Sequence, residues 1–234
     1  AAWGLVAHWS RWRDRWFVSD AGGVLVLLAL WPVALMFPVS VPFGLGQVFE
    51  RLEAAVANAL EGTPWIDWLP MREVELQPLL PISEVLCIGM GLLLPCLLAF
   101  SVLRTLPQRM LASSLGLVVG VMASSLSAAL TYGPAHAWDW IGPEVLKGLV
   151  LAAVALGLLL RARPRACLVL ALVVLVWQLS MLNQASADVY FAQTLQNWEQ
   201  GRFIRFHGLI QWLGWLWPYA LLVHLVRRLS RPQI

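Results

Sequence analysis

The sequence predicts an all-α, polytopic membrane protein with about six transmembrane helices and two external amphipathic surface helices. Three observations predict this class: 60% of the 234 residues are hydrophobic, only 12% are charged, and the apolar residues form long continuous runs. A soluble globular domain carries about 25% charged residues. Only helices or closed barrels satisfy their own peptide groups in lipid, and barrel strands alternate in polarity. Continuous apolar runs therefore favour helices.

Six apolar segments approach the length of about 20 residues that a membrane-spanning helix needs. Prolines, glycines and charged residues flank them and set their approximate bounds. The predicted spans run from Ala21 to Pro38, Ile82 to Leu103, Met110 to Leu130, Val145 to Leu160, Ala166 to Leu182 and Leu209 to Val226. Neither an internal repeat nor a low-complexity linker divides them, so one membrane domain is expected.

Arginine accumulates in alternate connections between these segments, and positive charges close to spans are retained on the cytoplasmic side. Four arginines fall in one set of connections and eleven in the other set, which comprises Arg11, Arg13, Arg15, Arg104, Arg109, Arg161, Arg163, Arg165, Arg227, Arg228 and Arg231. Both termini are therefore predicted to be cytoplasmic, in the inner membrane of a bacterium. Residues 44–81 and 183–208 become the two long external connections.

Residues 1–20 are interpreted as a cytoplasmic interfacial segment that precedes the six-span domain at 21–234. Tryptophans alternate with arginines here, a mixture typical of an interfacial anchor. The opening "AAWGLVAHW" lacks the charged start and cleavage pattern of a signal peptide. It resembles the tail of a helix, and we expect it to end an upstream helix of a longer protein.

Each external connection is predicted to hold a short surface helix. In residues 46–62, Val48, Leu52, Val56 and Leu60 recur every four positions with charged residues between them, which indicates an amphipathic helix. In the second connection, apolar residues share one face before Gly201, a typical stop signal.

The cluster Glu199, Arg202, Arg205 and His207 is the first candidate site. These arginines lie on the external side, so the topology rule does not explain them. Arg202 and Arg205 are three residues apart and would share one helix face, as a fork suited to a phosphate or carboxylate. An anionic lipid headgroup or a lipid-linked precursor would fit. The alternatives are structural ion pairs with external carboxylates, or catalysis.

Glu84 and Lys147 form the second candidate, an intramembrane polar pair. The predicted spans place them at a similar depth, and charges in a membrane are costly unless they are paired or hydrated. They are therefore expected to be partners or site residues. The alternative is that both side chains extend separately to the outer interface.

Small residues recur every fourth position along the third predicted span and form a helix-packing ridge: Ala112, Gly116, Gly120, Ser124 and Ala128. Such a ridge lets a neighbouring backbone approach closely, and close packing holds helices together in lipid. The pattern does not distinguish a helix of this chain from one of a partner protein.

No cofactor and no metal site is predicted. His207 and His224 are the histidines that would ligate a haem or a chlorophyll, but neither lies in a recognisable motif. The three cysteines fall in apolar runs without metal-ligand spacing, which favours buried thiols. The net charge of +3 follows from topology, and no basic segment with interleaved aromatic residues predicts nucleic-acid binding.

Three stretches, "YFAQTLQNWEQGRFIRFHGLIQWLGWLWPYALL", "WLPMREVELQPLLP" and "LTYGPAHAW", resemble the C-terminal membrane region of long bacterial VanZ-family proteins. The short Asp, Lys, His and Asn motifs of the VanZ core are absent, so no functional residue is carried over. The resemblance implies an inner-membrane protein associated with the cell envelope.

Three functions are considered. The first is a non-enzymatic VanZ-like protein that binds lipid or a lipid-linked anion through Arg202 and Arg205. The second is an accessory subunit packed against other integral membrane proteins in a respiratory or photosynthetic complex. The third is a membrane enzyme acting on lipid phosphates, with Glu84, Glu199 or His207 as acid or base.

Overall fold

The computed structural model describes residues 16–18, 20–37, 39–66, 79–185 and 207–231. Helices dominate this part of the chain, and an isolated β-bridge pairs Phe17 with Leu103. The helices are α2 (Gly22–Ala34), α3 (Phe49–Leu60), α4 (Pro81–Phe100), α5 (Leu106–Tyr132), the 3-10 turn η2 (Pro134–His136), α6 (Pro143–Leu159), α7 (Pro164–Gln184) and α9 (His207–Leu229). The predicted all-α class is confirmed for the described residues.

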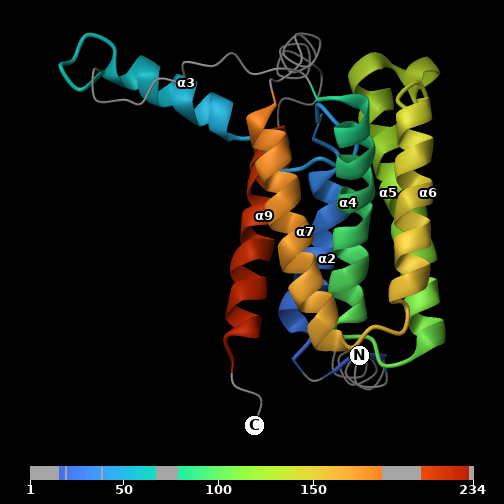
Figure 1. The fold of residues 1–234 in the computed structure, drawn as a ribbon. Helices are drawn as coiled ribbons and strands as arrows, with labels where there is room; N and C mark the ends of the chain where they lie inside the picture. The colour runs from blue at the N-terminus through green and yellow to red at the C-terminus, as the bar shows by residue number, and fades with distance from the viewer. Residues whose placement is uncertain (1–15, 19, 38, 67–78, 186–206, 232–234) are drawn as a thin grey trace, which may run out of the picture.

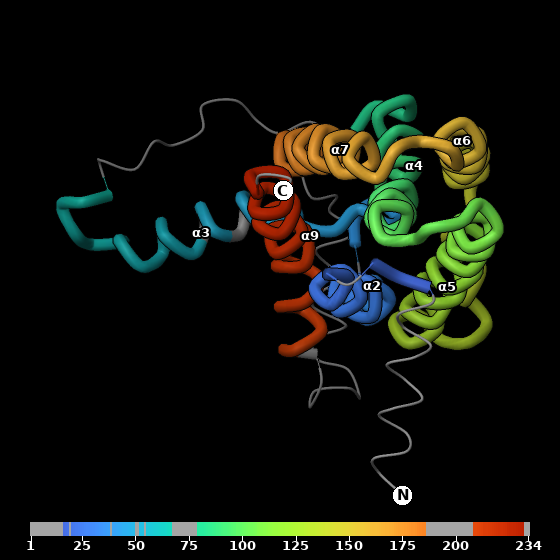
Figure 2. Tube along the Cα trace, turned by 90° about the horizontal axis from the view of Figure 1, so that it is seen from below, coloured from blue at the N-terminus to red at the C-terminus, as the bar shows by residue number. Residues whose placement is uncertain are grey.

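Six of these helices stand side by side as an antiparallel bundle, while α3 projects away from it at one end (Figures 1 and 2). Each of the six predicted spans corresponds to one bundle helix. The turns after α4 and α6, and the end of α9, lie at the lower end in Figure 1. The described arginines of the larger set lie in or next to these turns, so the structure brings them to one end of the bundle: Arg104, Arg109, Arg161, Arg163, Arg165, Arg227, Arg228 and Arg231. Arg11, Arg13 and Arg15 lie outside the described residues.

The number of six spans is supported only in part. Among the described residues, four helices are long and apolar enough to cross a membrane: α4, α5, α7 and Gly208–Leu229 of α9. Helix α2 has 13 residues and α6 has 17, so they rise about 20 and 26 Å against a hydrocarbon core of about 30 Å. The first predicted span extended to Pro38, but the helix ends at Ala34 and the chain turns after it.

Helix α4 is the centre of the bundle and packs against α2, α5, α6 and α7. Every residue from Cys87 to Phe100 is buried, as expected for a helix that is apolar on all sides. Gly148 of α6 lets that helix approach closely, since a Cβ built there would lie 2.6 Å from Ile88 Cγ2. The close contact between α4 and α6 therefore depends on Gly148, which does not belong to the predicted ridge on α5.

The predicted ridge on α5 faces the inside of the chain at its centre. A Cβ on Gly116 would lie 3.1 Å from Cys96 Sγ, and one on Gly120 would lie 2.8 Å from the Trp31 ring. Ala128 is buried. This part of the ridge contacts other segments of the same chain.

Residues 35–37 and 39–48 form a largely buried, non-helical segment between α2 and α3. The segment is predicted to turn external at Gly44, yet Phe43 and Leu45 are almost fully buried. Phe43 adopts a left-handed backbone with φ of 63° and stacks on Trp31. Non-helical backbone at membrane depth is tolerated where protein surrounds it and satisfies its polar groups.

Side chains from α5, α7 and α9 satisfy that backbone. Ser127 donates to the Met36 carbonyl at 2.9 Å, and Gln178 donates to the Phe43 carbonyl at 3.4 Å. Asn183 and Tyr219 both donate to the Gly46 carbonyl at 3.1 Å. Three helices that are distant in sequence therefore position this one segment.

Asn183 also determines where α3 begins. Its Oδ1 accepts the backbone N–H groups of Val48 and Phe49 at 3.0 and 3.1 Å, as a capping side chain does for a helix N-terminus. Leu52 remains exposed on α3, in agreement with a surface helix. The second predicted surface helix falls in 186–206, outside the described residues.

Arg109 is buried and joins the ends of three helices. Its guanidinium donates to the carbonyls of Phe100, Leu160 and Ala162 at 2.6 to 2.9 Å. The terminal carbonyls of a helix have no partner within that helix. Arg109 supplies the missing donors for the ends of α4 and α6.

We predict that Arg109→Met lowers the free energy of unfolding by about 2 to 3 kcal/mol, because buried carbonyls lose charge-assisted hydrogen bonds. Thermal unfolding in detergent measures this loss. Arg104→Met is the matched control, because Arg104 is exposed in the same connection and its loss removes the same charge. Equal Tm values for the two variants would contradict the capping role.

We also predict that Gly91→Ala destabilises the bundle by about 1 to 3 kcal/mol, the usual cost of overpacking. A Cβ at Gly91 would lie 2.5 Å from the Phe43 carbonyl oxygen, whereas one at Gly157 on α6 meets no atom within 4 Å. Gly157→Ala should therefore leave Tm unchanged or slightly raised. A Gly91→Ala protein as stable as Gly157→Ala would refute the close approach of residues 35–48 to α4.

Candidate binding cavity

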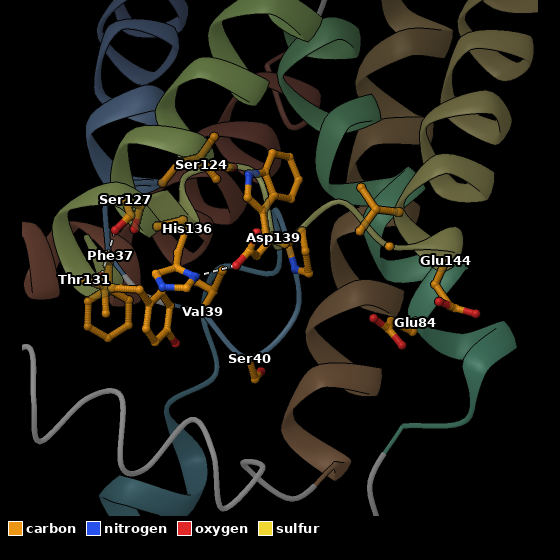
Figure 3. A pocket seen from close by; sticks show the side chains of 17 residues that line it. Phe37, Val39, Ser40, Glu84, Ser124, Ser127, Thr131, His136, Asp139 and Glu144 are labelled. Carbon is orange, nitrogen blue, oxygen red and sulfur yellow. Dashed lines mark hydrogen bonds and ion pairs between the residues drawn. The ribbon is translucent and has the colours of Figure 1, made fainter. Parts of the chain in front are cut away.

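A cavity of about 550 Å³ opens at the end of the bundle that lies opposite the arginine-rich turns. Residues 35–42 form one wall, and the last turns of α5 form another. The η2 turn and the first turn of α6 close the third side, and Glu84 of α4 completes the rim (Figure 3). The cavity thus collects residues from five parts of the chain.

Breaks in helix geometry explain why the chain folds back here. Helix α5 ends at Gly133, whose φ of 100° suits glycine, and Pro134 follows directly. Trp140 then fixes the returning loop: its indole N–H donates to Ser125 Oγ at 3.1 Å, and its ring meets Phe43 edge-on. Trp140 and Phe43 therefore tie the loop to the buried 35–48 segment.

A row of hydroxyl groups lines the α5 wall. Ser124, Ser127 and Thr131 are three and four residues apart and share one helix face. Thr131 donates to the Ser127 carbonyl at 2.8 Å. Because Ser124 precedes the end of α5 at Tyr132 by eight residues, the polar wall extends about 12 Å into the bundle.

Most of the remaining lining is apolar, so the cavity combines hydroxyl groups with apolar surface. Leu35, Phe37, Val39 and Pro42 come from the connection after α2, which also contributes the polar Ser40, and Val145 comes from α6. Phe37 lies close to Thr131 in Figure 3 and packs edge-on against Trp215 of α9. A cavity with both hydroxyl and apolar surface suits an amphipathic molecule.

Charged side chains surround the opening. His136 Nδ1 lies 2.6 Å from the Asp139 carboxylate, and both side chains are exposed. Glu144 is half-buried and lies 3.8 Å from Lys147 Nζ. In Figure 3 Glu84 lies next to Glu144 on the same side of the cavity.

The structure shows no ion pair between Glu84 and Lys147, the predicted intramembrane pair. Both residues are described, and the ion pair that Lys147 makes is with Glu144 on its own helix, three residues earlier. The lysine side chain is 65% exposed, while Glu84 faces the cavity. Similar depth on two helices did not imply that the two side chains point toward each other.

The predicted arginine cluster falls largely outside the described residues. Glu199, Arg202 and Arg205 belong to 186–206, and His207 is described only as the first residue of α9. The anion-binding role of Arg202 and Arg205 stays a prediction. Two residues of the predicted packing ridge on α5, Ser124 and Ala128, line the cavity.

His224, the second histidine considered for a cofactor, packs against α2. A Cβ on Gly23 would lie 2.8 Å from the His224 ring, and His224 Nε2 is buried without a hydrogen-bond partner among the described residues. Within the described ranges, no three His, Cys, Asp or Glu side chains are grouped as metal ligands usually are. Haem or chlorophyll ligation remains an untested hypothesis.

A smaller, apolar groove of about 360 Å³ lies between α2, α4 and α5, toward the arginine-rich end. Ala112 and Gly116 of the ridge line it, together with Trp31 and Cys96. Its lining is apolar except for Gln108. The groove could hold an apolar group, but apart from Gln108 it has little polar surface to orient a ligand.

Comparison with protein-family models, with curated proteins and with solved structures finds no match. The resemblance to VanZ-family proteins therefore remains a prediction. The functional reading depends on the chemistry of the cavity itself.

Sequence reasoning missed most of the cavity. Ser127 and Thr131 are seen in the sequence only as single hydroxyl residues in an apolar helix, and Asp139 only as an external carboxylate. One signal was available: hydroxyls at 124, 127 and 131 follow helical spacing and point to one polar face. The apolar lining had no such signal, because Leu35 and Phe37 were counted in the predicted span that ends at Pro38.

We predict that Ser124→Cys reacts with a membrane-impermeant maleimide added outside intact cells, because a polar cavity of this size holds water and thiolates react in water. Leu126→Cys should react poorly, since Leu126 lies on the outer, apolar surface of the same helix. The native cysteines Cys87, Cys96 and Cys167 are buried. Equal labelling of both variants would exclude a hydrated cavity at Ser124.

Proposed function

We propose that this chain is a non-enzymatic membrane protein that binds an amphipathic lipid in the cavity, as a VanZ-like component of a bacterial inner membrane. The mixed polar and apolar lining of the cavity carries the proposal. Its hydroxyl groups and charged rim suit a polar headgroup, while its apolar side chains and the adjacent bundle surface suit acyl chains.

Topology supports an external opening for the site. The cavity lies at the end of the bundle away from the arginine-rich turns, and arginine-rich turns are typically cytoplasmic. A lipid of the outer leaflet of the inner membrane would reach the opening from the side. The predicted contribution of Arg202 and Arg205 to a phosphate group is compatible with this placement and needs its own test.

The hydrogen bonds of the cavity favour binding over catalysis. A nucleophilic hydroxyl needs a neighbouring base, and Ser127 and Thr131 instead donate to backbone carbonyls. The His136 ring is bonded to Asp139 on the same turn. Among the described residues, no serine or threonine hydroxyl is hydrogen-bonded to a histidine.

We predict that Ser124→Trp, which fills the cavity, lowers the amount of phospholipid retained after purification in a mild detergent. Native mass spectrometry of the full chain, supplied with a mixture of phosphatidylethanolamine and phosphatidylglycerol, measures retention. Leu126→Trp adds the same side chain outside the cavity and should retain lipid as the wild type does.

Unchanged retention in a folded Ser124→Trp protein would exclude the cavity as the lipid site. Tm measurement separates lost binding from lost folding. If Ser124→Trp does not fold, Thr131→Trp fills the cavity closer to its opening. Unchanged retention in that variant would exclude the site as well.

A second candidate is an accessory subunit of a larger membrane complex. Trp177, well inside α7, is 57% exposed on the bundle surface, whereas tryptophans that contact lipid concentrate at the membrane interfaces. A partner helix would cover this ring. Migration of the extracted protein as a lone chain would remove this candidate.

A further inference from the structure

We infer that the cavity recognises an alkylammonium group, which lies between the carboxylates of Glu84 and Glu144. This inference deepens the proposed function and depends on it: it names the headgroup chemistry that the lipid site selects. The inference follows from how two helices position these carboxylates, from the charge around them and from the remaining lining.

The contact between α4 and α6 places the two carboxylates opposite each other. Gly148 and Ile88 mark a close contact of these helices, with a distance of 2.6 Å from a Cβ built on Gly148 to Ile88 Cγ2. Glu84 precedes Ile88 by four residues, and Glu144 precedes Gly148 by four. Residues four apart lie on the same helix face, so both carboxylates lie one turn beyond this contact (Figure 3).

Two carboxylates held together in a half-buried place repel each other, and a cation between them relieves the repulsion. Lys147 contacts Glu144 at the edge of the ion-pair range, 3.8 Å, and its side chain extends into solvent. Within the described ranges, no cationic side chain forms an ion pair with Glu84. The space beside Glu84 belongs to the cavity, so a ligand can bring the cation.

The rest of the lining favours an organic cation over a metal ion. Ca²⁺ takes six to eight oxygen ligands, and the cavity that Glu84 and Glu144 line is also lined by Val145, Pro42 and Trp140. An ammonium group needs up to three acceptors and is also attracted to an aromatic face. Apolar and aromatic surface beside two carboxylates therefore matches an ammonium carried on an organic molecule.

The same chemistry has two sources, a zwitterionic lipid headgroup such as phosphoethanolamine and a free soluble amine. Binding of the full-length chain to phosphatidylethanolamine and to phosphatidylglycerol with identical acyl chains separates headgroup selection from acyl-chain binding. Ethanolamine alone, added as a competitor, separates the two sources. Displacement would indicate that the ammonium group suffices, and a lack of displacement would indicate that the acyl chains are required.

The expected result is a preference of about tenfold for phosphatidylethanolamine over phosphatidylglycerol, equivalent to about 1.4 kcal/mol. Glu84→Gln and Glu144→Gln should each reduce the preference, and the double variant should abolish it. Phosphatidylglycerol should bind the double variant as well as or better than the wild type, because an anionic headgroup no longer meets two carboxylates. Glu61→Gln, at the exposed end of α3, should leave the preference unchanged.

The outcomes distinguish this inference from the function on which it depends. Equal binding of the two lipids, or a preference that survives in the double glutamine variant, would overturn ammonium recognition while lipid binding stands. Absence of lipid binding in the wild type, or binding that is insensitive to Ser124→Trp, would overturn the proposed function itself. If ethanolamine binds to the wild type and neither lipid binds, the cavity is a site for a soluble amine and the proposed lipid-binding function is wrong.

Discussion

The need to satisfy peptide groups away from water governs the part of this protein on which the cavity depends. Residues 35–48 leave helical geometry inside the bundle, so their carbonyl and N–H groups lose the partners that a helix would provide. Gln178, Asn183 and Tyr219 replace those partners. If this exchange failed, the segment would not stay buried, and the cavity would lose much of its apolar lining.

Close packing at glycines converts that satisfied segment into a defined site. Gly91 brings α4 against the backbone of Phe43, and Gly148 brings α6 against Ile88. Each contact removes the room for even one methyl group. The positions of Glu84 and Glu144 follow from the second contact, so a glycine one helix turn away from the cavity rim influences which charges meet there.

The two ends of the bundle use charge in different ways. At the arginine-rich end, Arg109 is buried and completes the hydrogen bonding of two helix termini, a structural role in addition to its place in the topology pattern. At the other end, the carboxylates Glu84, Asp139 and Glu144 line an open cavity and are accessible to a ligand. The first arrangement stabilises the fold, and the second offers a site for recognition.

The sequence by itself determined the membrane class, the all-helical content, the six helical segments and the alternation of arginine-rich turns. These properties depend on composition and on local periodicity, which do not require knowledge of partners in space. The amphipathic helix after Gly46 was predictable for the same reason, because its apolar residues follow the helical repeat.

Only the tertiary structure decided how long α2 is, what surrounds residues 35–48 and which side chains meet in the cavity. Apolar residues such as Phe37 and Phe43 look alike in sequence whether they extend a helix or pack in a buried turn. Lys147 forms its ion pair with Glu144 on its own helix, and the contact of Gly148 with Ile88 helps to set which face of α6 meets α4. Such choices depend on contacts between residues distant in the chain, and a single sequence carries no local signal for them.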